Sequence, residues 1–258
     1  MSKRFRLPSG NDAISSRTHK PRKQFIPAND AVIAQPTTLA SSIRPTERQL
    51  ELINQYVPVG MEPLTADEVV VLPFVAANNL PTRNIGAWTE PDLYKMADLL
   101  PGLPSTTDHD WDNVVKVVGR VFEAEVQKSP TAPQEVLDQA GYYEINKQIV
   151  ESDGFVQTLC NIYFEVDSPV IRGLRFGRLG EVSVGGFNFQ TVQCPICGTS
   201  FMDDNCPHLI PSPWLDLENP EIRKLVAPYY ERIGLVDLME ISLVTTPACP
   251  NAGVIQQG

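Results

Sequence analysis

The hydrophobic and polar positions of this chain switch between two periods, one typical of strands and one typical of helices. Alternating or β-branched apolar runs predict strands over residues 68–78, 114–126, 154–167, 179–187 and 238–248. Amphipathic periodicity and capping residues predict helices over residues 46–57, 89–100, 132–151 and 219–235, and another that begins at Ser168. Because the two kinds of element mix without a strict strand–helix–strand order, we expect an α+β fold or a closed sheet surrounded by helices.

The first 45 residues differ from the rest of the chain. They are polar, contain proline and lack periodicity, which predicts an extended, disordered arm before a folded domain at residues 46–258. Residues 1–24 hold seven of the 21 Lys and Arg residues, whereas the whole chain has a net charge of −10. The acidic remainder argues against general nucleic-acid binding, so we expect any such contact only through the basic arm 1–24.

The chain shows no apolar run long enough to span a bilayer and no basic-then-apolar secretory signal, which predicts a cytoplasmic protein without a membrane partner. It has five cysteines. An odd number, three of them crowded together, is not typical of a disulfide framework. We therefore expect a metal site and two separate thiols.

The crowded cysteines lie in the segment "CPICGTSFMDDNCPH", within a predicted hairpin insertion at residues 190–215. The Cys-Pro-x-Cys-Gly form is typical of a tight knuckle whose backbone N–H groups point at thiolates. The predicted ligands of a structural Zn²⁺ ion are Cys194, Cys197, Cys206 and His208. Alternatives for the fourth ligand are Asp203, Asp204 and Cys249.

A second candidate site centres on Ser183 in the strand "EVSVGGF", where alternation places the hydroxyl on the face opposite two valines. A serine nucleophile needs a base and an acceptor that orients the base. His109 is the best candidate base, because His19 lies in the arm and His208 belongs to the cysteine cluster. The two residues Gly185 and Gly186 are expected to present backbone N–H groups to an oxyanion.

The acceptor for the base is open from residue types alone. Glu240 shares one face of the last predicted strand with Ser242, and Asp108 and Asp110 flank His109 directly in the sequence. Any of the three carboxylates is a candidate third member.

Three segments with these residues occur in a distinctive order. The first segment has a predicted helix and a loop with glycine and proline that ends in the Asp-His pair of "TTDHDW". A predicted strand that contains "VGRV" follows it. Next come "SVGGF" and finally "EISLVTTPACPNA" at residues 240–252. Over about residues 68–252, their order and wording resemble the tailed-phage prohead (capsid maturation) serine protease family, similar in fold to the herpesvirus assemblins. The extra glycine of "SVGGF" and the 190–215 insertion depart from the family pattern.

The resemblance implies Ser183 as nucleophile, His109 as base and Glu240 as third member. It implies a closed β-barrel-like sheet surrounded by helices, and a serine endopeptidase that cleaves scaffolding and capsid proteins, and itself, by acyl transfer. It places the protein in the host cytoplasm, inside the viral procapsid, and implies self-association as a dimer or larger assembly. The alternatives are a catalytically inactive, zinc-containing assembly or adaptor protein and, as a third class, a metallohydrolase.

Overall fold

The computed structural model describes residues 44–110, 113–138, 143–203, 205–210, 215, 218–249 and 251–255. The chain divides into two compact units, Met1–Leu39 and Ala40–Gly258, and every described residue belongs to the second. The arm predicted over residues 1–45 therefore falls almost entirely outside the described residues.

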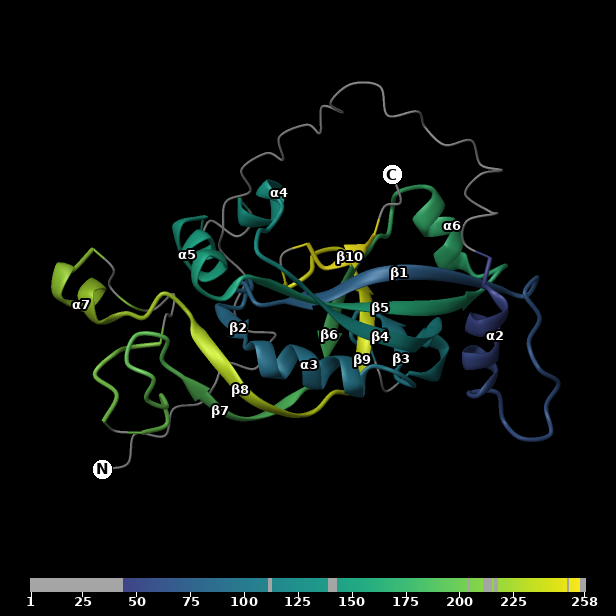
Figure 1. Ribbon diagram of the computed structural model, residues 1–258, viewed down its shortest axis with the longest axis horizontal. Coiled ribbons are helices and arrows are strands. Elements are labelled where there is room, and N and C mark those ends of the chain that lie inside the picture. The colour runs from purple at the N-terminus through teal and green to yellow at the C-terminus, as the bar shows by residue number, and fades with distance from the viewer. Residues whose placement is uncertain are drawn as a thin grey trace, which may run out of the picture. The chain divides into compact units, whose positions relative to one another are not determined.

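The described strands form a seven-stranded sheet and a smaller three-stranded sheet (Figure 1). The strands of the large sheet are β1 (Val69–Asn78), β3 (Pro104–Thr107), β4 (Gly119–Ser129), β5 (Phe155–Glu165), β6 (Glu181–Gly185), β9 (Glu240–Val244) and β10 (Gly253–Val254). Their order is β1-β10-β6-β9-β3-β4-β5, and β5 pairs in turn with β1, so the order is closed. Only β3 and β9 pair in parallel within this described sheet. The small sheet has the order β2 (Gly86–Trp88), β8 (Tyr230–Asp237) and β7 (Asn188–Gln193).

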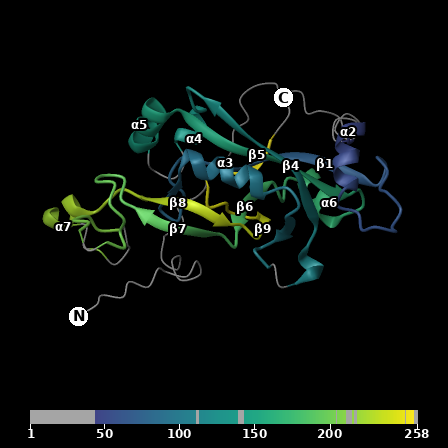
Figure 2. The ribbon, with the colours of Figure 1, turned by 60° about the horizontal axis from the view of Figure 1, so that its bottom comes forward.

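Helices lie around the sheets. They are α2 (Glu47–Asn54), α3 (Glu90–Leu99), α4 (Gln134–Leu137), α5 (Tyr143–Asp153), α6 (Pro169–Arg175) and α7 (Pro220–Leu225), with a 3₁₀ turn at Val114–Lys116. Figure 2 shows α3 between β8 and the strands β4 and β5, which it contacts. None of the described helices is long and apolar enough to cross a membrane. The mixed α+β class, with helices around a sheet, is as the sequence predicts.

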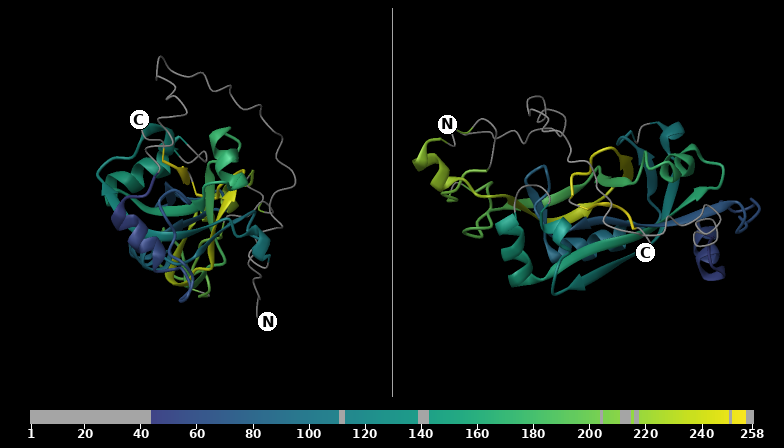
Figure 3. Two further views of the ribbon diagram at one scale, coloured as in Figure 1. Left: turned by 90° about the vertical axis from the view of Figure 1, so that its right-hand side faces the viewer. Right: turned by 90° about the horizontal axis from the view of Figure 1, so that it is seen from above.

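Two pairs of strands join into one long antiparallel ribbon. β6 pairs with β9, and after a short junction β7 pairs with β8. At the junction the N–H of Met239 donates to the carbonyl of Gly185 at 3.3 Å. The near half of the ribbon, β6 and β9, belongs to the closed sheet. The far half, β7 and β8, extends toward α7, at the end of this unit opposite α2 (Figure 3).

Side-chain alternation along the near half of the ribbon separates apolar from polar residues. Val182 and Val184 of β6 lie in the main hydrophobic core together with Ile241 and Leu243 of β9. Ser183 and Ser242 form a register pair between them and point to the other face. The strand faces predicted from the sequence are therefore confirmed.

The helix predicted over residues 219–235 is wrong. α7 ends at Leu225, and the following residues form β8, which pairs with β2 and β7. Pro228 cannot continue a helix, and the segment after it is rich in residues that favour strands. The conformation of this segment is therefore decided by its two sheet partners. β2 is distant in the sequence, and a long connection separates β7 from β8.

Two other elements begin or break where the periodicity does not show it. The strand predicted from residue 114 begins at Gly119, where a Cβ would lie 2.6 Å from the carbonyl oxygen of Tyr163. The helix predicted over 132–151 is two helices, α4 and α5, with residues 139–142 between them outside the described part.

Candidate active site and metal centre

His109 and Glu240 form a close imidazole–carboxylate pair. Nδ1 of His109 lies 2.6 Å from Oε1 of Glu240. The glutamate is fully buried, whereas 35% of the histidine side chain is exposed. Since an ionised carboxylate only accepts hydrogen bonds, a neutral imidazole in this contact would carry its proton on Nδ1 and present Nε2 as the acceptor nitrogen. This is the protonation pattern that a general base needs.

The turn after β3 brings the imidazole back over β9. β3 runs parallel to β9, so a straight continuation would carry the chain past Glu240. Asp108 and His109 instead adopt left-handed backbone conformations, with φ of 60° and 57°. Such conformations are uncommon outside glycine and concentrate at functional sites. The local strain at His109 thus accompanies its contact with the glutamate.

Two hydroxyl groups hold the other oxygen of the glutamate. Oε2 of Glu240 accepts hydrogen bonds from Thr106 Oγ1 and from Ser242 Oγ, each at 2.6 Å. Ser242 Oγ also accepts the backbone N–H of His109 at 2.9 Å. Thr106, Ser242 and Glu240 are all fully buried. The carboxylate therefore has hydrogen-bond partners on both oxygens, which compensates for its removal from water.

The pair lies directly over Gly185. A Cβ at this position would overlap Oε1 of Glu240 and would lie 2.5 Å from Nδ1 of His109. Ser183 is two residues earlier in the same strand, so its side chain points to the same face as this contact. The structure therefore brings Ser183, His109 and Glu240 to one face of the ribbon.

The serine hydroxyl and the imidazole lie on the same face of the ribbon, with no hydrogen bond between them. Among the described residues, His109 bonds to Glu240 and Ser242, and no bond joins it to Ser183. Ser183 keeps 6% of its surface exposed, whereas Ser242 is fully buried with its hydroxyl engaged. Contacts between nucleophile and base are often loose without substrate. Ser183 is thus the better placed hydroxyl of the two for attack on a ligand, and its role stays a prediction.

The structure distinguishes among the three carboxylates that the sequence left open. Glu240 makes the hydrogen bond to the imidazole. Asp108 and Asp110, although adjacent to His109 in the sequence, are not its partners within the described residues. The carboxylate that bonds to the imidazole comes from a strand residue 131 positions away in the sequence.

The second glycine of "SVGGF" is also explained by packing. Gly186 has a φ of 62°, and a Cβ there would lie 2.6 Å from the Cβ of Met239. Both glycines are therefore required by close contacts on their own account. That their backbone N–H groups donate to an oxyanion stays a prediction.

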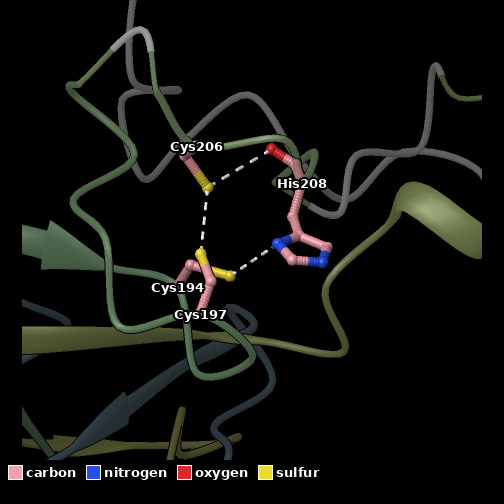
Figure 4. Close-up of side chains that lie close together, drawn as sticks. All are labelled: Cys194, Cys197, Cys206 and His208. Atoms are coloured by element: carbon pink, nitrogen blue, oxygen red, sulfur yellow. Dashed lines mark hydrogen bonds between the residues drawn. The ribbon is translucent and has the colours of Figure 1, made fainter.

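The cysteine cluster gathers four ligand atoms at the far end of the ribbon (Figure 4). The Sγ atoms and one imidazole nitrogen of Cys194, Cys197, Cys206 and His208 all lie within 4.8 Å of one another. Cys194 Sγ is 3.5 Å from His208 Nδ1, and the sulfurs of Cys197 and Cys206 are 3.8 Å apart.

These separations fit a tetrahedral zinc ion. Bonds of about 2.3 Å to sulfur and about 2.0 Å to nitrogen place two sulfurs about 3.8 Å apart and a sulfur and a nitrogen about 3.5 Å apart. Three thiols and one imidazole complete a four-coordinate set. The four residues could therefore hold a metal with no coordination position left for water, as in structural sites.

Local backbone geometry prepares the first two ligands. Cys194 follows β7, and its carbonyl accepts the N–H of Gly198, which has a φ of 70°. Hydrogen bonds from Thr199 lower the pKa of the Cys197 thiol to about 6. Burial raises the pKa of Cys206, its hydrogen-bond partner. A bound cation would favour the thiolate form of both.

The two remaining cysteines are separate, as predicted. Cys160 and Cys249 are buried free thiols, and burial raises the pKa of each to about 12. Cys249 Sγ accepts the backbone N–H of Asn78, so this thiol does not replace His208 as a ligand. Asp203 is also outside the cluster, and Asp204 lies outside the described residues.

Sequence reasoning missed Thr106 and the steric role of Gly185. Thr106 belongs to the "TTDH" segment, but only its register pairing with Ser242 shows that it faces the glutamate.

Comparisons with models of protein families, with curated proteins and with solved structures found no match.

Proposed function

We propose that this chain is a serine endopeptidase in which Ser183, His109 and Glu240 act in series. The observation that carries the proposal is the 2.6 Å hydrogen bond between His109 and Glu240, formed over Gly185 on the ribbon face that carries Ser183. A partly exposed imidazole held by a buried carboxylate, on the strand face that carries a serine, offers the groups that can activate a hydroxyl.

In the proposed reaction, the Ser183 oxygen attacks the carbonyl carbon of a peptide bond while Nε2 of His109 takes the hydroxyl proton. Glu240 keeps Nδ1 protonated and stabilises the imidazolium. Backbone N–H groups at Gly185 and Gly186 stabilise the oxyanion. His109 then gives the proton to the leaving amine, and a water molecule hydrolyses the acyl-enzyme by the same steps in reverse.

The proposed substrates are scaffolding and capsid proteins, and the chain itself, inside an assembling procapsid in the host cytoplasm. This part rests on the resemblance of the three ordered motifs to prohead maturation proteases. The closed strand order is in keeping with the barrel-like core that the resemblance implies. Self-association as a dimer or larger assembly belongs to the same proposal.

A fluorophosphonate probe tests the chemistry without knowledge of the natural substrate. We expect wild type to be labelled at one serine, and Ser183→Ala and His109→Ala to remain unlabelled. Ser152→Ala, which removes an exposed hydroxyl on α5, is the matched control and should label as wild type does. Labelling of Ser183→Ala at the wild-type rate would remove the basis of the proposal. Cleavage of a capsid–scaffold fusion by wild type and not by Ser183→Ala tests the substrate class.

The Cys/His cluster favours a second candidate, a catalytically inactive assembly or adaptor protein. The cluster lies at the far end of the ribbon, where it could shape a surface for a partner. This candidate predicts no covalent labelling of any serine and normal head assembly with Ser183→Ala. The protease proposal predicts the opposite of both.

A further inference from the structure

Ser242 contacts both members of the imidazole–carboxylate pair. Its hydroxyl accepts the backbone N–H of His109 at 2.9 Å and donates to Oε2 of Glu240 at 2.6 Å. We infer that Ser242 is a positioning residue, which holds the base and its carboxylate in register for proton transfer. This inference rests on the proposed hydrolase function.

The direction of both hydrogen bonds follows from the chemistry of the partners. A backbone N–H can only donate, and a carboxylate oxygen only accepts, so Ser242 is the acceptor in its bond to His109 and the donor in its bond to Glu240. Thr106 Oγ1 lies 2.5 Å from Ser242 Oγ and 2.6 Å from the same carboxylate oxygen. The hydrogen-bonding partners of the Ser242 hydroxyl are thus His109, Glu240 and Thr106.

Ser242 has a contact that Thr106 lacks. Both hydroxyls reach Oε2 of Glu240, but only Ser242 also bonds to the main chain of His109. That main chain is in the left-handed region, with a φ of 57°. The Ser242 side chain on β9 therefore stabilises the strained turn and fixes the position of the His109 backbone, from which the imidazole extends.

The same contacts distinguish positioning from nucleophilic attack. Ser242 is fully buried, and its partners at His109 and Glu240 are the backbone N–H and the carboxylate, not the imidazole ring. The ring nitrogen that faces the carboxylate is already bonded to Oε1. Ser242 therefore acts through His109 and Glu240, and does not touch the reacting atoms.

The test compares Ser242→Ala with a matched substitution at Ser105. Ser105 is also a fully buried serine, one residue before Thr106, but its hydroxyl has no hydrogen-bond partner among the described residues. Both variants remove one buried hydroxyl, and only the first removes the contacts in question. Ser242→Cys, which is close in size and retains only a weak donor and acceptor, is a second variant in case alanine prevents folding.

The first readout is the labelling reaction with the fluorophosphonate probe. For Ser242→Ala and Ser242→Cys we expect the maximal labelling rate to fall about 10- to 100-fold, by analogy with residues that orient the ligands of a metal ion. The half-saturating probe concentration should stay unchanged, because the probe does not contact Ser242. Ser105→Ala should label as wild type does.

The second readout does not depend on catalysis. The chain has three histidines, so the ring nitrogens can be assigned by NMR with ¹⁵N-labelled histidine. We expect an exchange-protected, downfield Nδ1–H signal from His109 in wild type and Ser105→Ala, and its loss in both Ser242 variants. An unchanged signal in the folded Ser242 variants would overturn the inference, whatever happens to labelling. If wild type is never labelled but the signal depends on Ser242, the positioning stands and the proposed hydrolase function fails.

Discussion

At the scale of single residues, the candidate active site depends on the lack of a side chain at Gly185. Gly185 has no Cβ, and the space that a Cβ would fill is occupied by Oε1 of Glu240 and approached by Nδ1 of His109. The sequence suggests these glycines for their backbone freedom. For Gly185, the contacts above it give a more specific reason, because any side chain would displace the pair.

Gly185→Ala should therefore slow the labelling of Ser183 strongly, with only a moderate loss of stability. Forcing a methyl group into an occupied space costs typically about 1–3 kcal/mol of stability. Displacing a base by about 1 Å lowers its contribution by about 100-fold. Labelling kinetics and urea denaturation of the same samples measure both effects.

Gly180→Ala is the matched control for this change. A Cβ at Gly180, one residue before β6, would meet only Val254 Cγ1 at 3.7 Å, an ordinary contact. It should leave both the labelling rate and the urea midpoint near wild type. Wild-type labelling of Gly185→Ala would show that the pair over this strand is not needed for reactivity.

At the scale of elements, the ribbon links the two candidate sites. β6 and β9 carry the residues around Ser183, and their continuations β7 and β8 lead to the Cys/His cluster. The end of the cysteine segment is tied back to the chain before β8, because Leu209 exchanges backbone hydrogen bonds with Leu225 and Ala227. A metal at the cluster would thus close the far end of the ribbon.

A buried arginine secures β2 against the ribbon. The guanidinium of Arg232 in β8 lies 4.7 Å from the ring centroid of Trp88 in β2 and 5.4 Å from that of Phe187. Burial lowers the pKa of this group. Since Phe187 follows the two glycines directly, these stacked side chains join the near and far halves of the ribbon.

Loss of one thiol should release the metal and loosen the ribbon. We expect one zinc per purified chain in wild type and none in Cys194→Ser, with a lower Tm, because a structural zinc contributes directly to folding. Elemental analysis and thermal unfolding, each with and without a chelator, measure the two effects. Cys160→Ala, which changes a buried thiol outside the cluster, should keep its zinc. Full zinc content in Cys194→Ser would contradict the assignment.

At the scale of the whole molecule, both candidate sites belong to the unit Ala40–Gly258. Every hydrogen bond described above for Ser242, His109 and Glu240 lies inside this unit, and so does the Cys/His cluster. The basic residues of the arm 1–24 belong to the other unit.

A chain that begins at Ala40 should therefore keep both sites. We expect its labelling rate and zinc content to equal those of the full chain, and its Tm to differ by no more than a few degrees. A Ser183→Ala version of the short chain is the control for specific labelling. Failure of the shortened chain to label, with its fold intact by circular dichroism, would show that residues 1–39 contribute to the active site.

Much of the local structure could be predicted because its causes are local. Thr46 and Gln49 form the reciprocal cap that their spacing predicts, and Ser168 caps α6. Strand alternation placed Ser183 and Ser242 opposite the branched aliphatic side chains of the core, because successive side chains must point to opposite faces. The Cys-Pro-x-Cys-Gly knuckle is similarly defined within a few residues.

What the sequence by itself determined is therefore the set of chemical groups, the strand faces and the local turns that carry them. Only the tertiary structure decided which carboxylate pairs with His109, that residues 230–237 form a strand and that Gly185 must lack a side chain. Each of these depends on atoms brought together from distant parts of the chain, the imidazole and its glutamate being 131 residues apart. Periodicity and propensity describe neighbours along the sequence, whereas these contacts arise only when β3, β6 and β9 pair side by side.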